Sequence, residues 1–376
     1  MRVRVVLATR ALSGVLGGLE RQLREISSAL CDFDFEIHLI YLSDSDQETF
    51  FKLDNRIIQH KISGRSPDKK TNWLGRLQRQ REVLSLLKEI RPNIAITFMT
   101  GSYYFVCLPA LLLRIPLILA ERNSPQIYEV TSAAKKRRWI FLSMIFATKI
   151  TTQFTSYIQK YPVYLHKKFI SIPNAIPAEI ENLLPRIKPL GKPVVYLFAG
   201  RFSFQKRVEL LIESFAEFSQ DKNDVILNIF GSGQSEDQLR KRIRELRADS
   251  RIFLHSASKD LSSEILKADA LCIPSLWEGF PNVLLESLYL GVPGLGFSNC
   301  DGVKDLLTDG ENGWLAEFGS DGSSYTALLE RSYVDIKNFA ISKEACRDSV
   351  KNYVPKKVYG NWKKLIEDYS SKPMAQ

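Results

Sequence analysis

The sequence is poor in the residues that build metal centres and disulfide frameworks. Its few histidines are isolated from one another and none stands at the spacing of a zinc-ligand pair. Its cysteines are scattered, with no Cys-x-x-Cys pair, which favours reduced thiols in a cytoplasm. The residues concerned are His38, His60, His166 and His255, with Cys31, Cys107, Cys272, Cys300 and Cys346. Catalysis through an imidazole-bound metal is therefore not expected.

Two short acidic pairs are the remaining candidates for a metal site. Asp32-Phe33-Asp34 and Asp44-Ser45-Asp46 flank the apolar run EIHLIYL. Aspartates in loops at strand ends are usually turn formers. We predict that the protein has no metal site and needs no cofactor.

The sequence also lacks an uninterrupted run of about 20 apolar residues, the length that a membrane-spanning helix needs. The opening RVRVVLATR is too short for a signal peptide and is interpreted as a buried strand. The longest apolar stretch, 103–119, contains Arg114 and is broken by Pro109 and Pro116. This stretch predicts a buried helix followed by the strand PLILAE.

What the chain does have is length and positive charge. A chain of 376 residues suits two domains, and the net charge of +10 with a pI near 9.2 indicates an anionic partner. No zinc-finger or helix-turn-helix pattern supports nucleic acid as that partner. Anionic lipid and phosphorylated substrates remain as the candidate partners.

Short apolar runs alternate with helix-length amphipathic segments along the whole chain, which is typical of doubly wound α/β domains. The first series is VRVVLA, EIHLIYL, NIAITF, PLILAE and KITTQF, and the second is VVYLFAG, VILNIF, RIFLH, ALCIPS and VPGLGF. We predict a first domain over 1–176, a linker over 177–193 and a second domain over 194–353. Residues 354–376 are predicted to form a C-terminal helix.

The strongest motif is PSLWEGFPNVLLESLYLGVP, over 274–293, where a strand ends and a helix is predicted to start near Asn282. With Asn282 as N-cap, the first helix amides would be open to a phosphate. Glu278 and Glu286 flank that position and would suit hydroxyl groups better than phosphate. The alternative is that both carboxylates are solvated surface charges.

A second motif, AGRFSFQKRVELLIESF, follows the strand VVYLFAG. Arg201 and Lys206 flank its loop, where two cations could hold a diphosphate and stabilise a departing nucleotide. Solvated loop cations are the alternative. The glycine pairs after two other strands, Gly17-Gly18 and Gly231-x-Gly233, permit close backbone approach to a ligand or simply close packing.

Taken together, these pieces resemble glycosyltransferase family 4, which has the GT-B fold of two Rossmann-like domains facing a central cleft. Glu278 and Glu286 match the family's Glu-x7-Glu element, Gly200 with Arg201 and Lys206 matches its Gly-Arg…Lys element, and Gly17-Gly18 matches its early glycine loop. IPNAIP and LLTDGENGWL resemble further family segments. By this resemblance the C-terminal helix returns to the first domain.

The resemblance implies a role for each matched position. Arg201 and Lys206 would bind the donor diphosphate and act in catalysis with Glu278, which orients the donor sugar. Glu286 would bind the ribose. The remaining donor-binding positions implied are Gly17, Gly18, Gly279, Phe280, Asn282, Val283 and Leu284. The family retains the anomeric configuration and uses no divalent metal.

One segment departs from the family pattern. Many relatives have a histidine at the end of a first-domain strand, whereas this chain reads LAERNSP there. Glu121, Arg122 and Asn123 resemble an element of enzymes that extend bacterial lipid-linked oligosaccharides and surface polysaccharides. We interpret the three residues as an acceptor-facing or sugar-facing element.

Two basic segments bear on membrane association. KKRRWIFLSMIF, over 135–146, joins cations to an apolar run with Trp139 at the junction, as an interfacial helix does. Its apolar residues could equally pack on the sheet. Trp73 with Arg76, Arg79 and Arg81 forms a second basic surface, which would suit a pyrophosphate-linked acceptor or be merely solvated.

The resulting hypothesis is a metal-independent, retaining glycosyltransferase. It would move a hexose or N-acetylhexosamine from a nucleotide diphosphate sugar, UDP-linked by preference, to a lipid-linked or polysaccharide glycan. We expect it in the cytoplasm, peripherally attached to the inner face of the plasma membrane. The alternatives are a nucleotide-sugar 2-epimerase of GT-B architecture and a non-catalytic nucleotide-sugar-binding protein.

Overall fold

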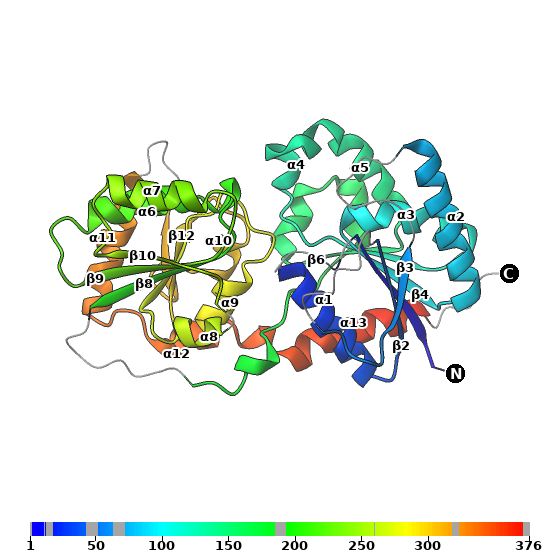
Figure 1. Ribbon diagram of the computed structural model, residues 1–376. Helices are drawn as coiled ribbons and strands as arrows, with labels where there is room; N and C mark the ends of the chain where they lie inside the picture. Colours follow the sequence, from blue (N-terminus) through cyan, green and yellow to red (C-terminus); the bar gives the residue numbers. More distant parts are fainter. Residues whose placement is uncertain are drawn as a thin grey trace. The chain divides into compact units, whose positions relative to one another are not determined.

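The computed structural model describes residues 2–10, 12, 18–42, 52–62, 72–184, 193–258, 260–317 and 323–370. The chain divides into two compact units (Figure 1). Unit 1 consists of Met1–Ala175 with Pro355–Gln376, and unit 2 consists of Ile176–Val354. A short 3-10 turn, η5 (Ala178–Ile180), therefore belongs to unit 2. Residues 185–192 of the predicted linker lie outside the described residues.

Unit 1 is built on a seven-stranded parallel sheet with the order β3-β2-β1-β4-β5-β6-β7. The central strands are buried on both faces, as parallel sheets covered by helices are. The strands are β1 (Arg4–Thr9), β2 (Glu36–Leu42), β3 (Ile58–Ile62), β4 (Ile94–Phe98), β5 (Leu117–Ala120), β6 (Lys149–Thr152) and β7 (Phe169–Ser171). The edge strands β3 and β7 were not predicted. β3 (IQHKI) is mostly exposed and so has no continuous apolar run.

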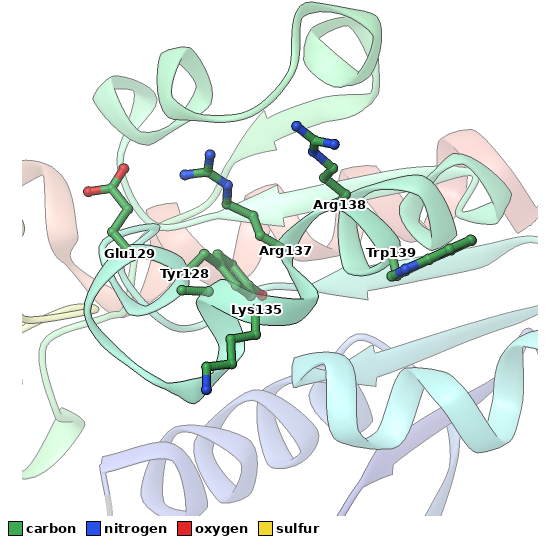
Figure 2. Close-up of a pocket in the computed structure, with 7 residues that line it drawn as sticks. Tyr128, Glu129, Lys135, Arg137, Arg138 and Trp139 are labelled. Carbon is green, nitrogen blue, oxygen red and sulfur yellow. The ribbon is translucent and has the colours of Figure 1, made fainter.

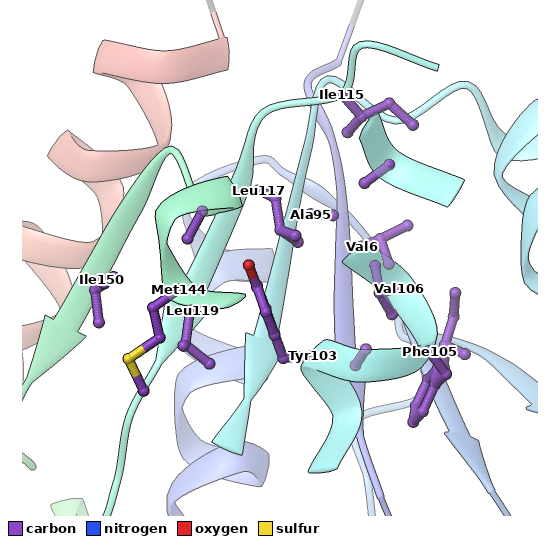
Figure 3. Packing of buried hydrophobic residues seen from close by; sticks show 14 of the residues in the cluster. Val6, Ala95, Tyr103, Phe105, Val106, Ile115, Leu117, Leu119, Met144 and Ile150 are labelled. Carbon is purple, nitrogen blue, oxygen red and sulfur yellow. The ribbon is translucent and has the colours of Figure 1, made fainter. Parts of the chain in front are cut away.

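Helices cover both faces of this sheet. One buried cluster lies under α2 and α3 and includes Tyr103, Val106 and Met144 (Figure 3). The cluster on the other face includes α1 and the C-terminal helix α13, whose Trp362 is fully buried. The C-terminal helix thus returns to the first unit, as predicted. The helices are α1 (Gly18–Asp32), α2 (Trp73–Ile90), α3 (Met99–Leu112), α4 (Ile127–Val130), α5 (Arg137–Ser143) and α13 (Pro355–Ser370).

Unit 2 repeats the architecture with a six-stranded parallel sheet, ordered β10-β9-β8-β11-β12-β13. The strands are β8 (Val194–Ala199), β9 (Val225–Phe230), β10 (Ile252–His255), β11 (Ala270–Ile273), β12 (Gly294–Phe297) and β13 (Gly313–Ala316). The helices are α6 (Val208–Phe218), α7 (Glu236–Glu245), α8 (Leu261–Ile265), α9 (Asn282–Tyr289), α10 (Val303–Leu306), α11 (Ser323–Lys337) and α12 (Lys343–Ser349). The two-domain Rossmann-like prediction is confirmed, and β13 is an additional strand.

The strand order of unit 2 reverses between β8 and β11. The chain runs from β8 outward through β9 to β10, and then returns to place β11 on the other side of β8. Parallel doubly wound sheets bind ligands where the order reverses, just beyond the carboxyl ends of the strands. The two segments that follow β8 and β11 are therefore the first place to look for a site.

Helix α3 was predicted to be buried, but only one side of it is buried. Tyr103 and Val106 on its inner side are fully buried (Figure 3), but Tyr104, Leu108 and Leu112 on its outer side are exposed. The hydropathy of a helix without charges does not reveal that only one side is covered. None of the described helices is both long and apolar enough to span a bilayer.

Candidate functional site

The candidate site of unit 2 is formed by two segments that follow adjacent parallel strands. We call residues 200–207 the β8 loop and residues 274–281 the β11 loop. Leu276 N–H donates to the Gln205 carbonyl over 2.9 Å, and the Gln205 side-chain amide donates to the Trp277 carbonyl over 2.6 Å. These reciprocal bonds hold the two loops against each other.

A charged pair completes the contact between these loops. The Lys206 ammonium donates to Glu278 Oε1 over 2.6 Å. The Glu278 side chain is only 6% exposed and that of Lys206 is 22% exposed. A carboxylate this deeply buried needs a partner, because an unpaired buried charge is strongly destabilising. Lys206 is a partner that also reaches solvent, and an ammonium has further donors for a ligand.

The segment after β12 fixes the backbone of Glu278. Glu278 N–H donates to the Asp301 carbonyl over 3.1 Å. Gly302 has a φ of +81°, and a Cβ added there would lie 2.8 Å from the Glu278 carbonyl oxygen. Glycine is therefore required at this position both for its backbone conformation and for space.

The Gly231-x-Gly233 turn supports the β8 loop from its other side. A Cβ at Gly231 would lie 2.0 Å from the Gly200 carbonyl oxygen, and one at Gly233 would lie 2.4 Å from that of Phe202. The Phe202 N–H donates to the Ser232 carbonyl over 2.9 Å. Close backbone packing accounts for this glycine pair. The packing holds Arg201, which is exposed and makes no ion pair with any described residue.

Helix α9 follows the β11 loop and carries Glu286, which is buried in its second turn. The predicted N-cap was wrong by one position: Pro281 is the cap, and Asn282 is the first helical residue. Because the first turn starts there, Leu284 N–H donates to the Pro281 carbonyl over 2.9 Å and is not open to a phosphate. Val283 N–H has no acceptor among the described residues, so it is the amide available to a ligand.

The other predicted positions are spread over both units. Gly279 and Phe280 lie in the β11 loop, and the Phe280 ring packs 5.9 Å from that of Tyr353. Gly17 lies outside the described residues, and Gly18 is the exposed first residue of α1 in unit 1. The structure thus joins Lys206 and Glu278 directly, places Arg201 in the same β8 loop, and puts Glu286 in the adjoining helix.

Glu121, Arg122 and Asn123 directly follow strand β5 of unit 1. Glu121 is 1% exposed and accepts a 2.6 Å hydrogen bond from the Tyr128 hydroxyl. Burial raises the pKa of the Glu121 carboxyl, while the bond from Tyr128 opposes that rise. Glu121 is therefore held by a neutral donor, and Asn123 is partly exposed beside it.

Arg122 is held inside unit 1. It donates to the Ile172 carbonyl over 2.9 Å, and its guanidinium lies 5.0 Å from the centre of the Trp362 ring. Burial lowers the pKa of Arg122 to about 9, and the neighbouring Glu121 works against this. These contacts give Arg122 a structural role, tying α13 to the sheet.

Of the two acidic pairs considered as metal ligands, the structure describes only one. Asp32 accepts from Arg56 over 2.7 Å, and Asp34 pairs with Arg2 in a turn where its own φ is +65°. Asp44 and Asp46 lie outside the described residues. Across the described ranges, no three His, Cys, Asp or Glu side chains group as a metal site would require.

Sequence reasoning missed several residues of the site. Gln205 and Asp301 act through contacts between loops that are distant in the sequence, so no local pattern marks them. Ser275, after β11, is fully buried and its hydroxyl has no partner among the described residues. Gly302, in CDGVKD, was the one detectable signal, because glycine next to aspartate is common at positions of positive φ.

Comparison with known proteins relates the chain to glycosyltransferases. Residues 180–333 match the family model described as "Glycosyl transferases group 1". The chain is 24% identical over 374 residues to the GalNAc-α-(1→4)-GalNAc-α-(1→3)-diNAcBac-PP-undecaprenol α-1,4-N-acetyl-D-galactosaminyltransferase of Campylobacter jejuni, covering 94% of this chain and 95% of that one.

Solved structures show the same fold. The lipopolysaccharide outer core galactosyltransferase WaaB, in its apo form, superposes with a TM-score of 0.77 at 18% identity, covering 97% of this chain and 99% of that one. HepE of Anabaena in complex with UDP superposes with a TM-score of 0.78 at 16% identity, covering 97% and 100%.

The chain therefore has the GT-B fold, and the match to the group 1 glycosyl transferase model lies within unit 2. It is an enzyme of the glycosyltransferase class.

Proposed function

We propose that the protein is a retaining glycosyltransferase that takes a hexose or N-acetylhexosamine from a UDP-linked donor. The donor is bound by the β8 and β11 loops of unit 2, and the acceptor is a lipid-linked or polysaccharide glycan. The observation that carries the proposal is the 2.6 Å contact between Lys206 and Glu278 at the point where the strand order reverses. That contact puts a cation and a carboxylate at the usual ligand position of such sheets.

The donor roles follow from the chemistry of each group. Lys206 and the exposed Arg201 are cations that suit a diphosphate, and Val283 N–H at the start of α9 adds a neutral donor. Glu278 and Glu286 are acceptors that suit hydroxyl groups of the donor sugar and the ribose, respectively. HepE, which shares the fold, has been solved with UDP, and this supports a uridine nucleotide.

The reaction needs stabilisation of charge on the leaving group. The bond between the anomeric carbon and the diphosphate oxygen breaks, and the electron pair stays on the phosphate. Lys206 and Arg201 would stabilise this negative charge. The acceptor hydroxyl attacks from the same face and gives its proton to the leaving phosphate, so the configuration is retained. We propose that neither a divalent metal nor a cofactor takes part.

The acceptor proposal is supported by the Campylobacter jejuni relative, whose name specifies an undecaprenyl-diphosphate-linked glycan. WaaB, named for lipopolysaccharide, also acts on a lipid-borne glycan. Such acceptors reside in a membrane, which would place the enzyme at the cytoplasmic face of the plasma membrane. The excess of basic residues fits an anionic membrane surface and a pyrophosphate group.

A panel of nucleotide sugars offered to the purified protein with EDTA tests the proposal. We expect release of UDP from a UDP-sugar, unaffected by EDTA, and an α-linked product by NMR when a glycan acceptor is added. A β-linked product would contradict retention, and dependence on added Mg²⁺ or Mn²⁺ would contradict metal independence. Formation of a C2-epimer, or binding of the donor with no turnover, would favour the two alternatives instead.

A further inference from the structure

Helix α3 exposes apolar side chains that the core of unit 1 does not use. The helix contains no charged residue. Its inner side packs on the sheet (Figure 3), while its outer side exposes large apolar residues to solvent. These are Tyr104, Leu108, Leu111 and Leu112. A continuous exposed apolar stripe of this kind marks a surface that meets a partner or a membrane.

The helices next to α3 also expose apolar side chains. The Tyr103 hydroxyl of α3 donates to the Ser143 carbonyl at the end of α5 over 2.7 Å, and the Gln80 amide of α2 donates to the Tyr104 carbonyl over 2.7 Å. Helices α2, α3 and α5 are therefore adjacent. We call their exposed apolar side chains the outer face; they are Trp73, Leu74, Leu77, Tyr104, Leu108, Leu111, Leu112, Trp139 and Leu142, with Ile145 and Phe146 directly after α5.

Cations border the outer face at α5. A pocket lined by Lys135, Arg137, Arg138 and Trp139, with Glu129 of α4 as its one acidic residue, opens there (Figure 2). An adjoining pocket brings Arg138 and Leu142 together with the exposed Tyr164. Trp139 is 75% exposed at the junction of the basic and apolar parts. Indole rings at such a junction are typical of the interface between water and lipid.

The segment that follows Glu129 carries charge of one sign. Residues 130–170 contain eight lysines and arginines and no aspartate or glutamate. Lys135, Lys136, Arg137 and Arg138 are exposed and make no ion pair with any described residue. These cations are therefore not explained by partners within the described chain, and their charge is complementary to an anionic surface.

We propose that the outer face, with the cations of 135–138, docks unit 1 onto an anionic lipid bilayer. The apolar side chains enter the interfacial layer and the cations meet lipid phosphates. A second copy of the chain is the less suitable occupant. Two such faces in symmetric contact would bring like-charged clusters together, whereas lipid phosphates neutralise them. This surface lies outside the β8 and β11 loops. The inference rests on the membrane location proposed above and names the surface that makes the contact.

Vesicle sedimentation with the full chain tests the proposal. We expect binding to vesicles of phosphatidylcholine with phosphatidylglycerol, weak binding to phosphatidylcholine alone, and weaker binding at high salt. Arg137→Gln/Arg138→Gln should reduce partitioning by roughly 30-fold, the effect expected of two interfacial cations. Leu108→Ser/Leu112→Ser should reduce it by at least roughly 10-fold through lost apolar burial.

Matched variants in unit 2 serve as controls. Lys241→Gln/Arg244→Gln removes two exposed cations, and Val334→Ser removes an exposed apolar side chain. Both should bind vesicles like the wild type. All variants change exposed side chains, so circular dichroism melts and donor hydrolysis without vesicles should be unchanged. That second readout separates a failure of docking from a failure of the proposed function.

Three results would overturn the proposal. One is the absence of binding to anionic vesicles. Another is an equal loss of binding in the control variants. The third is concentration-dependent dimerisation that Leu108→Ser/Leu112→Ser abolishes while vesicle binding persists, because the outer face would then be an interface between copies.

Discussion

Each unit of this glycosyltransferase buries a glutamate after a strand, and the two are held in opposite ways. Glu278 of unit 2 contacts the Lys206 ammonium, whereas Glu121 of unit 1 accepts from the neutral Tyr128 hydroxyl. Both glutamates donate their backbone N–H to a carbonyl in a neighbouring segment, that of Asp301 and Thr151 respectively. Glutamates with the same kind of backbone contact therefore give an ion pair in one unit and a carboxyl with a raised pKa in the other.

The neighbours of each glutamate explain the difference. The cation beside Glu121 in sequence, Arg122, is turned into the core against Trp362 and donates to the Ile172 carbonyl. The cation paired with Glu278 is partly exposed and can still meet a ligand. In unit 1 the arginine therefore stabilises the fold. In unit 2 the lysine stays partly exposed and can contact a ligand. Four experiments test this contrast.

The largest expected effect is on the stability of unit 1. Trp362→Ala should lower the free energy of unfolding by about 3–5 kcal/mol, because it empties a fully buried site beside Arg122. Urea denaturation followed by circular dichroism measures this. The matched control is Trp139→Ala, an exposed tryptophan of the same unit, which should change stability little. Equal losses for both would contradict a structural role for the packing of Arg122 on Trp362.

The next effect is on turnover in unit 2. Lys206→Met should lower kcat by about 10²–10³-fold, since it removes a cation that stabilises charge on the leaving group. Glu278→Gln should also lower turnover, because it breaks the pair that orients Lys206. Lys222→Met is the control: Lys222 pairs with Glu330 over 2.7 Å in the same unit but outside the two loops. If Lys222→Met is as damaging as Lys206→Met, the site is wrongly assigned.

A smaller effect is expected from the glycine that supports Glu278. Gly302→Ala should cost about 1–3 kcal/mol for the positive φ, and its clash with the Glu278 carbonyl should also reduce turnover. Gly310→Ala separates the two causes, because Gly310 has a φ of +78° but its Cβ would meet only Arg331 at 3.9 Å. We expect thermal destabilisation in both variants and a loss of turnover in Gly302→Ala alone.

The smallest effect concerns the pH dependence of stability. Because burial raises the pKa of Glu121 in the folded state, the folded protein holds this proton more tightly than the unfolded chain. The resulting stabilisation is fully present below the ordinary glutamate pKa of 4.5 and is lost as the pH rises through the raised pKa of the folded state. As the pH rises through this range, the free energy of unfolding of Glu121→Gln should therefore fall less than that of the wild type. Glu129→Gln, an exposed glutamate on α4, should follow the wild type. Urea denaturation at a series of pH values measures this, and parallel curves for all three proteins would contradict the raised pKa.

Local sequence was sufficient for all described strands except β3, β7 and β13, and for the positions of the main motifs. Each predicted strand is a short apolar run, and such runs are buried wherever a parallel sheet is covered on both faces. The prediction failed where the local pattern was weak. Strand β3 was missed because it is mostly exposed. The cap of the helix after the β11 loop is Pro281 and not Asn282. Because the helix starts one residue earlier than predicted, the Val283 amide is available to a ligand and the Leu284 amide is not.

The sequence by itself determined two parallel α/β units and placed Arg201, Lys206, Glu278 and Glu286 after strands or at a helix start. It did so because periodicity and loop chemistry are local properties of the chain. Only the tertiary structure decided that Lys206 meets Glu278 across 72 residues, that Arg122 turns inward, and that α3 leaves its outer side uncovered. Those outcomes depend on which segments become neighbours when the strand order reverses and the helices pack, and no local pattern contains that information.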